Sequence, residues 1–477
     1  MTILSSIYKA ILYFFTGALF KIPLGGDSTL DISLMILLLV PTGVYFMLRT
    51  KFMPIRMFPE MLRISLEKNE KKGDKKGSLS GVQALVVSTA TRVGMGNLVG
   101  VVAAVSAGGA GAVFWMWIMA IIGSAMAFVE ATLAQIHKEK DPLYDGYRGG
   151  PAYYMHAFFA KNKKKSVIAI LFALSGLICW CAISQVSSNS VTTMFESAFS
   201  VEIPRIATVS VLVVIAAFIV LRKHATVKVL DVIVPIMAVV YFALTVFVMI
   251  KNVTSLPSVF TRIFEEAFGI RQIVGGGIGA VIMCGVQRGL FSNEAGSGSA
   301  PCAAAAADVS HPAKAGLFQT LGVLIDTLVI CTCTAMLLLT VPSAAVEGLG
   351  GMDLLAASMQ YHFGKIGVVF IAVVLLLFSF STFLGILFYA RPNVAYVFGD
   401  NWTSQTVYKA IALAMFFVGG IMDPNFVWDF ADIGIGLMTV FNILAILLMS
   451  KQAMSSLDEY TLIVKERKNQ KKLDKQK

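Results

Sequence analysis

The chain alternates long apolar segments with short polar loops. About eleven of the segments approach the ~20 residues that a helix needs to cross a bilayer. They are 31–49, 81–107, 111–135, 166–193, 205–221, 226–250, 273–301, 315–340, 366–389, 405–421 and 425–450. Since backbone groups in lipid must find their hydrogen bonds within the protein, this pattern predicts an all-α integral membrane fold.

Basic residues gather in alternate loops, most densely in a basic loop at 50–80, in 136–165 and in a basic tail at 451–477. Cytoplasmic loops of membrane proteins are enriched in Lys and Arg, which predicts an outside N-terminus and a cytoplasmic C-terminus. We expect a multi-pass protein of a bacterial- or archaeal-type plasma membrane. Residues 1–30 read as an interfacial segment, and the tail has little to bury, which favours disorder.

Composition narrows the possible functions. The chain is 57% hydrophobic and 14% charged, with a mean hydropathy of +0.77 and a net charge of +11. The basic residues flank apolar spans, so we expect lipid headgroups as their partners, and not nucleic acid. Six cysteines within or beside apolar segments predict no disulfide framework. The sequence lacks transition-metal spacing, a nucleotide loop and a nucleophile motif, which indicates no cofactor and no enzyme.

Two spans combine glycines with polar groups in mid-segment, and we expect them to unwind near Asn97 and near Gly285. Non-helical backbone at membrane depth persists only where protein encloses it or where it lines a cavity. With 31–49 set aside as an extra helix, the breaks fall in the first helix of two five-helix halves, 81–251 and 273–450. That arrangement is typical of inverted-repeat transporters with a central site. For Gly275–Gly279 and Gly108–Gly111, close helix packing is an equal alternative.

Charged residues inside these spans must be paired or hydrated. We expect Arg288, Glu294 and Asp326 to form a buried charge network. Arg92 directly precedes the first expected break, which favours a functional role, whereas Glu130 and Asp231 lie near span ends and favour structural anchoring.

Several motifs resemble the alanine or glycine:cation symporter family, whose wider relatives have the leucine-transporter-type fold. They include QALVVSTATRVGMGNLVGV (83–101), YRGGPAYYM (147–155), RGLFSNEAGSGSAP (288–301), FSTFLGILFYA (380–390) and WDFADIGIGLM (428–438). The resemblance covers nearly the whole chain. It implies sodium- or proton-coupled symport of alanine, glycine or a related neutral amino acid, with a monomer as one expected form.

The resemblance also implies positions for the ligands. The substrate would be bound by Thr91, Arg92, Gly94, Met95, Gly96, Asn97, Gln185, Ser187, Gly285, Phe383 and Ile386. The coupling cation would be bound by Ala90, Val93, Phe378, Ser381 and Thr382. Hydroxyl and carbonyl oxygens of this kind suit a small hard cation.

Three departures from the family pattern qualify these expectations. Arg92 and Met95 stand where the family usually has Thr, and our hypothesis is that Arg92 does part of sodium's work by pairing with a carboxylate of the substrate or of Glu294. Ile386 replaces a pocket Trp, which leaves room for a larger substrate such as glutamine. Ser187 occupies the place of the family's Gln, with Gln185 two residues earlier, so either could reach the ligand.

Other classes of function remain alternatives. A proton-coupled or sodium-independent carrier follows if Arg92 replaces a sodium ion. An ion channel would need a repeated filter sequence or symmetry-related pore segments, and a membrane-embedded enzyme would need a catalytic cluster at one depth. The sequence shows neither of these features.

Overall fold

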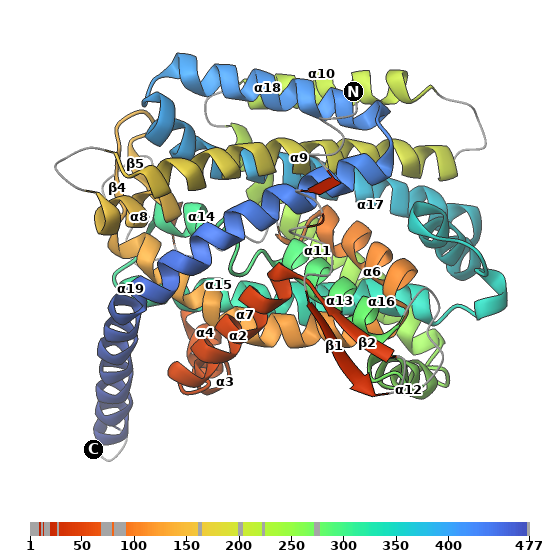
Figure 1. Ribbon diagram of the computed structural model, residues 1–477, viewed down its shortest axis with the longest axis horizontal. Coiled ribbons are helices and arrows are strands. Elements are labelled where there is room, and N and C mark those ends of the chain that lie inside the picture. The colour runs from red at the N-terminus through yellow and green to blue at the C-terminus, as the bar shows by residue number, and fades with distance from the viewer. Residues whose placement is uncertain are drawn as a thin grey trace.

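The structure, a computed structural model, describes residues 9–10, 13, 20–25, 28–67, 79–80, 92–160, 165–198, 204–221, 225–270 and 277–474, with 20–25, 28–32, 79–80, 225–234 and 471 described by backbone alone. Helices dominate it (Figure 1). The main ones are α2 (Leu34–Arg49), α4 (Phe58–Ser65), α6 (Val101–Gly108), α7 (Gly111–Ile136), α8 (Pro151–Phe159), α9 (Val167–Ala198), α10 (Arg205–Val220), α11 (Ala225–Lys251), α12 (Leu256–Ala267), α13 (Ile278–Asn293), α14 (Pro301–Ala306), α15 (Pro312–Leu324), α16 (Thr332–Leu339), α17 (Gly351–Phe398), α18 (Trp402–Ile421) and α19 (Pro424–Asp474). Shorter turns are α3 (Met53–Arg56), the π-helices η1 (Gly96–Gly100) and η2 (Ile325–Cys331), and the 3-10 turn η3 (Ser343–Ala345).

Three short strand pairs accompany the helices. β1 (Phe20–Gly25) pairs antiparallel with β2 (Ser28–Ile32), β3 (Leu79–Ser80) runs parallel to β6 (Ala307–Asp308), and β4 (Glu139–Asp141) pairs antiparallel with β5 (Gly146–Arg148). The hairpin β1–β2 begins within the interfacial segment expected at 1–30; most of the remainder of that segment lies outside the described residues.

Helix starts follow local sequence. The Ser33 hydroxyl accepts a hydrogen bond from the Ile36 amide (3.4 Å), and the Asn401 side chain accepts one from the Ser404 amide (2.8 Å). These residues cap α2 and α18 by satisfying amides that lack a helical partner. Proline lies in the first turn of α8, α14 and α15, where its missing amide proton costs no hydrogen bond.

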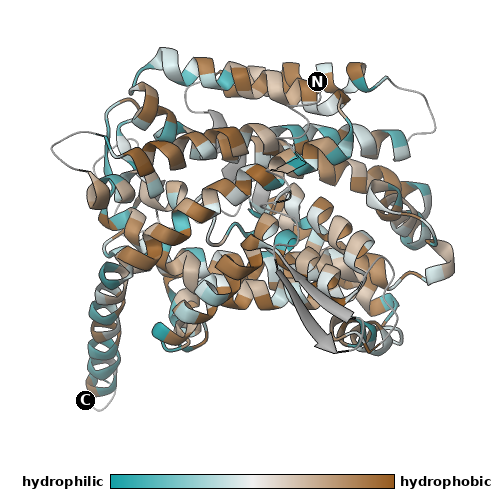
Figure 2. Ribbon diagram, viewed as in Figure 1, coloured by the Kyte–Doolittle hydropathy of each residue, from teal (hydrophilic) through white to brown (hydrophobic). Residues whose placement is uncertain are grey.

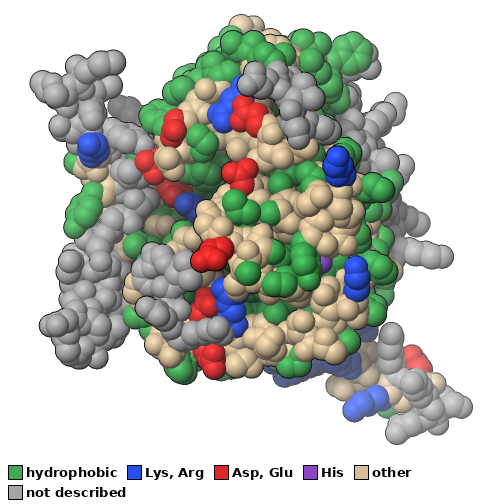
Figure 3. All heavy atoms as spheres, turned by 90° about the vertical axis from the view of Figure 1, so that its right-hand side faces the viewer, with side chains coloured by type: hydrophobic (Ala, Val, Ile, Leu, Met, Phe, Trp, Pro, Cys, Tyr) green, Lys and Arg blue, Asp and Glu red, His purple; other side chains and the backbone are tan. Residues whose placement is uncertain are grey.

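Among the described residues, six helices are long and apolar enough to cross a membrane, or seven if the bent pair Pro235–Lys251 and Leu256–Ala267 forms one span. The expected count of eleven is therefore not confirmed. α2 and α10 are apolar but only 16 residues long, and the span expected at 81–107 is described only from Arg92. Acidic and basic side chains appear on the end of the molecule that lies at the right of Figure 1 (Figure 3).

Two helices organise the core. α9 packs against α17, α18 and α19, while α7 packs against α13 and α15. Hydrophobic residues cover these helices on most sides (Figure 2), as expected for segments that face either lipid or one another. The large buried side chains include Trp180, Tyr389 and Phe383. This packing brings the end of α13, the start of η1 and the middle of α17 together.

The last helix corrects the expectation of a disordered tail. α19 runs without interruption to Asp474, and its hydrophilic end projects from the body (Figures 1 and 2). Leu457, Tyr460 and Val464 are at most 5% exposed, and their spacing of three and four residues places them on one helical face. The tail therefore does bury an apolar stripe, which the basic composition obscured.

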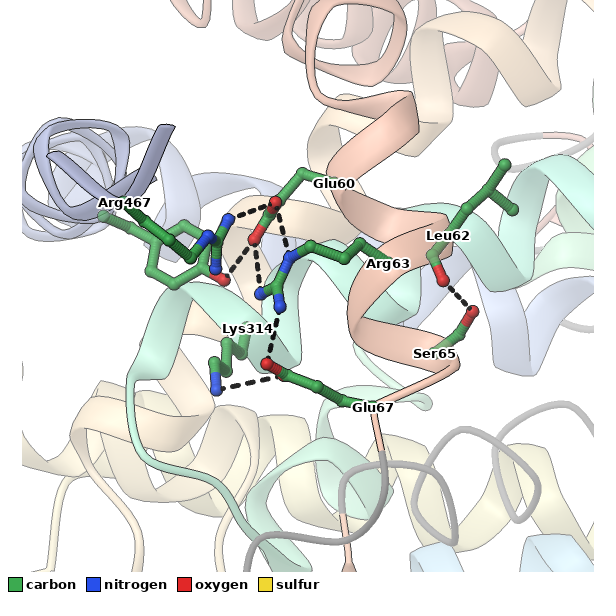
Figure 4. A network of polar contacts seen from close by, with 8 residues as sticks. Glu60, Leu62, Arg63, Ser65, Glu67, Lys314 and Arg467 are labelled. Carbon is green, nitrogen blue, oxygen red and sulfur yellow. Dashed lines mark hydrogen bonds and ion pairs between the residues drawn. The ribbon is translucent and has the colours of Figure 1, made fainter. Parts of the chain in front are cut away.

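A cluster of charges fastens α19 to α4 (Figure 4). Glu60 accepts hydrogen bonds from Arg63 Nε and Nη2 (2.9 Å each), from the Tyr460 hydroxyl (2.8 Å) and from Arg467 Nη2 (2.5 Å). Glu67, which pairs with Arg63, also lies 3.5 Å from Lys314 on α15. Burial raises the pKa of Glu60, but the hydrogen bonds from Arg63, Arg467 and Tyr460 lower it by more, to about 2.

Replacing this carboxylate should loosen the tail. In Glu60→Gln, residues 451–474 should exchange amide hydrogens faster, because Tyr460 and Arg467 lose their charged acceptor; hydrogen-exchange mass spectrometry measures this. Since the folded pKa lies below the ordinary 4.5, the stabilisation is complete above about pH 4.5 and is lost as the pH falls toward about 2. Unchanged exchange in the variant would show that apolar packing alone holds the tail.

Candidate substrate and cation site

The first break lies at Val93 and Gly94, where helical geometry lapses before η1 begins. The Gly94 amide donates to the Arg92 carbonyl (2.8 Å) and to Asn97 Oδ1 (3.3 Å). The Met95 amide donates to Thr382 Oγ1 on α17 (3.1 Å). The break expected near Asn97 thus falls just before it, and side chains satisfy the amides that the helix leaves unpaired.

Arg92 is fully buried at the start of this break. Its Nη1 donates to Oε1 of Gln319 (2.8 Å) and to the Gln319 carbonyl (3.3 Å). Its Nε and Nη2 have no hydrogen-bond partner in the described part of the chain. Unpaired donors on a buried guanidinium are costly, so this edge is where a ligand group would bring most stabilisation.

Asn97 and Asp326 join three elements beside the break. Asn97 Nδ2 donates to Asp326 Oδ1 (2.8 Å), and the Ser292 and Thr327 hydroxyls donate to Asp326 Oδ2 (2.7 and 3.0 Å). Asp326 lies in the π-helical turn η2, a geometry often found at functional sites. The Asn97 side chain is therefore used within the protein, so the expected contact with substrate would have to come from its backbone.

The second break is not at Gly285, which corrects our expectation. α13 continues to Asn293, and the chain leaves helical geometry over 294–300, where Glu294, Gly296 and Gly298 have φ values of 56°, 89° and 86°. Gly285 instead packs on α7, since a Cβ there would lie 2.5 Å from Trp115 Cβ and 2.6 Å from the Ala112 carbonyl. A glycine can serve close packing as well as unwinding, and only the neighbouring helix decides between them.

The loop of the second break is held by Glu130 and Asn442. The Gly296 amide donates to Glu130 Oε1 (3.2 Å), while Asn442 Nδ2 donates to Glu130 Oε2 (2.7 Å) and to the Gly296 carbonyl (2.9 Å). The Tyr154 hydroxyl donates to Asn442 Oδ1. Glu130 thus has the structural contacts of an anchor.

Arg288 does not join the expected charge network. It pairs with Asp432 on α19 (3.1 Å) and lies over the Trp428 ring, 4.3 Å from its centroid. Glu294 lies just past the end of α13 in a left-handed backbone conformation, so it and Arg288 face different neighbours. Arg92 is instead the positive charge that acts on all three buried carboxylates of the region, Glu130, Glu294 and Asp326.

The two candidates on α9 point in different directions. The Ser187 hydroxyl donates to Met95 Sδ (3.3 Å), next to the first break. Gln185 Nε2 donates to Met415 Sδ on α18 (3.1 Å). The structure therefore places Ser187 beside the break and turns Gln185 away from it.

The remaining expected residues lie on α17 or at the first break. Phe383 packs against Phe416 of α18 with ring centroids 4.6 Å apart, and Ile386 is buried. Ser381 donates to the Phe378 carbonyl (2.9 Å), Thr382 reaches the break as described, and Val93 is 1% exposed. Gly96 packs closely on Phe291 and Ser292 of α13. Ala90 and Thr91 lie outside the described residues.

Sequence reasoning missed two residues that shape the site, Gln319 and Asn442. Both are amides in otherwise apolar helical segments, α15 and α19. A buried amide requires hydrogen-bond partners, so an uncharged polar group at mid-span was a usable signal.

Comparisons with known proteins identify the family of the chain. A sequence profile described as the sodium:alanine symporter family matches residues 25–475. The chain belongs to this family. It is therefore a secondary transporter, a multi-pass membrane protein and not an enzyme.

Relatives in the family span similar lengths. The chain is 43% identical to a probable sodium/glutamine symporter of Bacillus subtilis (strain 168), over 90% of this chain and 88% of that one. It is 33% identical to a sodium/alanine symporter of Methanococcus maripaludis, over 92% and 96%. The fold resembles the solved structure of MhsT in complex with L-phenylalanine, with a TM-score of 0.60, 13% identity, and coverage of 80% of this chain and 92% of that chain.

The packing role of Gly285 can be tested against a matched glycine. Gly285→Ala should destabilise the carrier by about 1–3 kcal/mol, because the new methyl group meets α7 backbone and the stem of Trp115. Gly277→Ala, where a Cβ meets nothing within 4 Å, should leave stability unchanged. Thermal unfolding of the purified protein measures both, and equal effects would contradict the packing role.

Proposed function

We propose that this symporter couples an inward sodium gradient to uptake of a neutral amino acid, alanine or glycine, and that Arg92 binds the substrate carboxylate. Transport would proceed by alternating access between two five-helix repeats, 81–251 and 273–450, with the N-terminus outside. The basic loops support this orientation. The Arg92 guanidinium, buried beside a helix break, carries the proposal.

Two arginine–carboxylate pairs elsewhere in the chain support carboxylate binding by Arg92. Nε and Nη2 of Arg63 hold the carboxylate of Glu60 at 2.9 Å, and the same two nitrogens of Arg205 hold that of Glu196 at 2.6 and 2.7 Å. In Arg92 this edge has no hydrogen-bond partner among the described residues, while Gln319 fixes the opposite side of the group. A bidentate hydrogen-bonded pair between an arginine and a carboxylate is strong and geometrically selective.

Thr382 supports a cation site beside the carboxylate. Its hydroxyl lies against the Met95 amide, so the unwound backbone and α17 meet there. Hydroxyl and main-chain oxygens are ligands that a small hard cation prefers. The guanidinium supplies positive charge at the same place, so Arg92 would do part of the work of a sodium ion.

A glutamine-sized substrate is the second candidate. Ile386 is buried on α17 where a bulkier Trp would fill the pocket in the family pattern, and a relative named as a probable sodium/glutamine symporter is 43% identical. The smaller side chain favours acceptance of a longer substrate.

Transport assays on proteoliposomes test the roles of Arg92. Labelled alanine should accumulate under an imposed sodium gradient, and Arg92→Lys should raise KM about tenfold because it keeps the charge but loses the bidentate edge. Arg205→Lys, at an exposed pair, is the matched control and should transport normally. An unchanged KM in Arg92→Lys would contradict carboxylate binding.

The coupling role is tested separately with Arg92→Thr. This variant should depend more steeply on sodium than the wild type, since an ion must supply the charge that the guanidinium contributed. Sodium and pH dependence identical to wild type would remove this role, and uptake driven equally by a proton gradient alone would contradict sodium coupling.

Substrate size is tested by competition. Unlabelled glutamine should displace labelled alanine from the wild type, and Ile386→Trp should weaken glutamine at least tenfold while sparing glycine, because the indole fills the space of the longer side chain. If glycine and alanine alone compete in the wild type, the larger-pocket proposal fails.

A further inference from the structure

Glu294 is the second ionisable group at the site, and its surroundings differ from those of the other buried acids. Glu130 accepts hydrogen bonds on both oxygens from Gly296 and Asn442, and Asp326 accepts them from Asn97, Ser292 and Thr327. Glu294 receives a hydrogen bond from Tyr389, but its Oε2 is buried with no hydrogen-bond partner in the described part of the chain. Of these three carboxylates, it alone keeps an oxygen available.

The main chain holds Glu294 firmly at the second break. Its amide donates to the Leu290 carbonyl (2.8 Å), and its own carbonyl accepts from the Ser297 hydroxyl (2.7 Å). The residue has a left-handed backbone, with φ of 56°. Such a conformation is costly for a residue with a long side chain and persists where the surroundings impose it. The carboxylate is therefore placed by the fold.

Arg92 and Glu294 are a basic and an acidic side chain that do not contact each other directly. The Arg92 charge acts on Glu294, yet no direct ion pair joins these two described residues. Among the described residues, Nε and Nη2 of Arg92 and Oε2 of Glu294 have no hydrogen-bond partner. Two buried charges that leave their polar atoms unpaired are stabilised by a ligand carrying the complementary groups.

We propose that Glu294 receives the α-ammonium group of the substrate, so that the amino acid bridges Arg92 and Glu294 as a zwitterion. The inference rests on the proposed function, in which Arg92 takes the carboxylate. The carboxylate and the ammonium group of an α-amino acid are bonded to the same carbon atom. One break would supply Arg92 for the carboxylate, and the other would supply Glu294 for the ammonium group. One bound molecule would then contact both breaks at once.

Lactate provides the discriminating probe, since it has the carbon skeleton of alanine with a hydroxyl in place of the ammonium group. On the wild type, lactate should compete with labelled alanine at least tenfold more weakly than alanine does. Glu294→Gln should weaken alanine about tenfold or more and leave lactate unchanged, because a charge-assisted hydrogen bond contributes about 1.5–3 kcal/mol. Glu347→Gln, on an exposed loop, is the matched control.

Affinities are measured by competition of uptake and by ligand-induced thermal shifts of the purified carrier, which report binding even in a variant that does not transport. Equal competition by lactate and alanine on the wild type would overturn the inference. The inference would also be overturned if Glu294→Gln weakened binding of both probes alike, as a structural role predicts. The same holds if the variant changed the sodium requirement but left the ratio of the alanine and lactate affinities unchanged. Arg92→Lys should weaken both probes equally; if it weakens neither, the proposed carboxylate site fails independently.

Discussion

A guanidinium buried away from water sets the main electrostatic constraint on the candidate site. Arg92 is fully buried, and moving an ion of this kind out of water costs several kcal/mol unless partners replace the solvent. Gln319 replaces part of the water that would surround the guanidinium. Glu130, Glu294 and Asp326 lie where the charge of Arg92 acts on them. The other two guanidinium nitrogens of Arg92 have no hydrogen-bond partner among the described residues.

The two helix breaks are stabilised by different means. At the first, side chains accept hydrogen bonds from backbone amides. Asn97 accepts from the Gly94 amide, and Thr382 on α17 accepts from the Met95 amide. At the second, Glu130 accepts a hydrogen bond from the Gly296 amide, and Asn442 donates one to the Gly296 carbonyl. Both solutions meet the rule that backbone polar groups at membrane depth need partners. They also tie each break to a neighbouring helix.

The chain belongs to the sodium:alanine symporter family, which links this geometry to transport. Two residues depart from the pattern that the resemblance implies. The resemblance to the family implies Thr at the position of Arg92 and Trp at that of Ile386. Under the proposed function, Arg92 would change which charges accompany the substrate, and Ile386 would change the size of substrate that fits. The two effects are separable because the residues lie on different elements.

The sequence by itself determined the membrane class, the boundaries of α7, α9 and α18 to within a few residues, the break beside Arg92 and the family, since hydropathy and long motifs are local properties. It could not place the second break, because glycine serves unwinding and close packing equally, and the neighbouring Trp115 decided that Gly285 packs. It also could not pair Arg288 with Asp432 or order the tail against Glu60. Those outcomes depend on contacts between residues more than a hundred positions apart, which only the tertiary structure brings together.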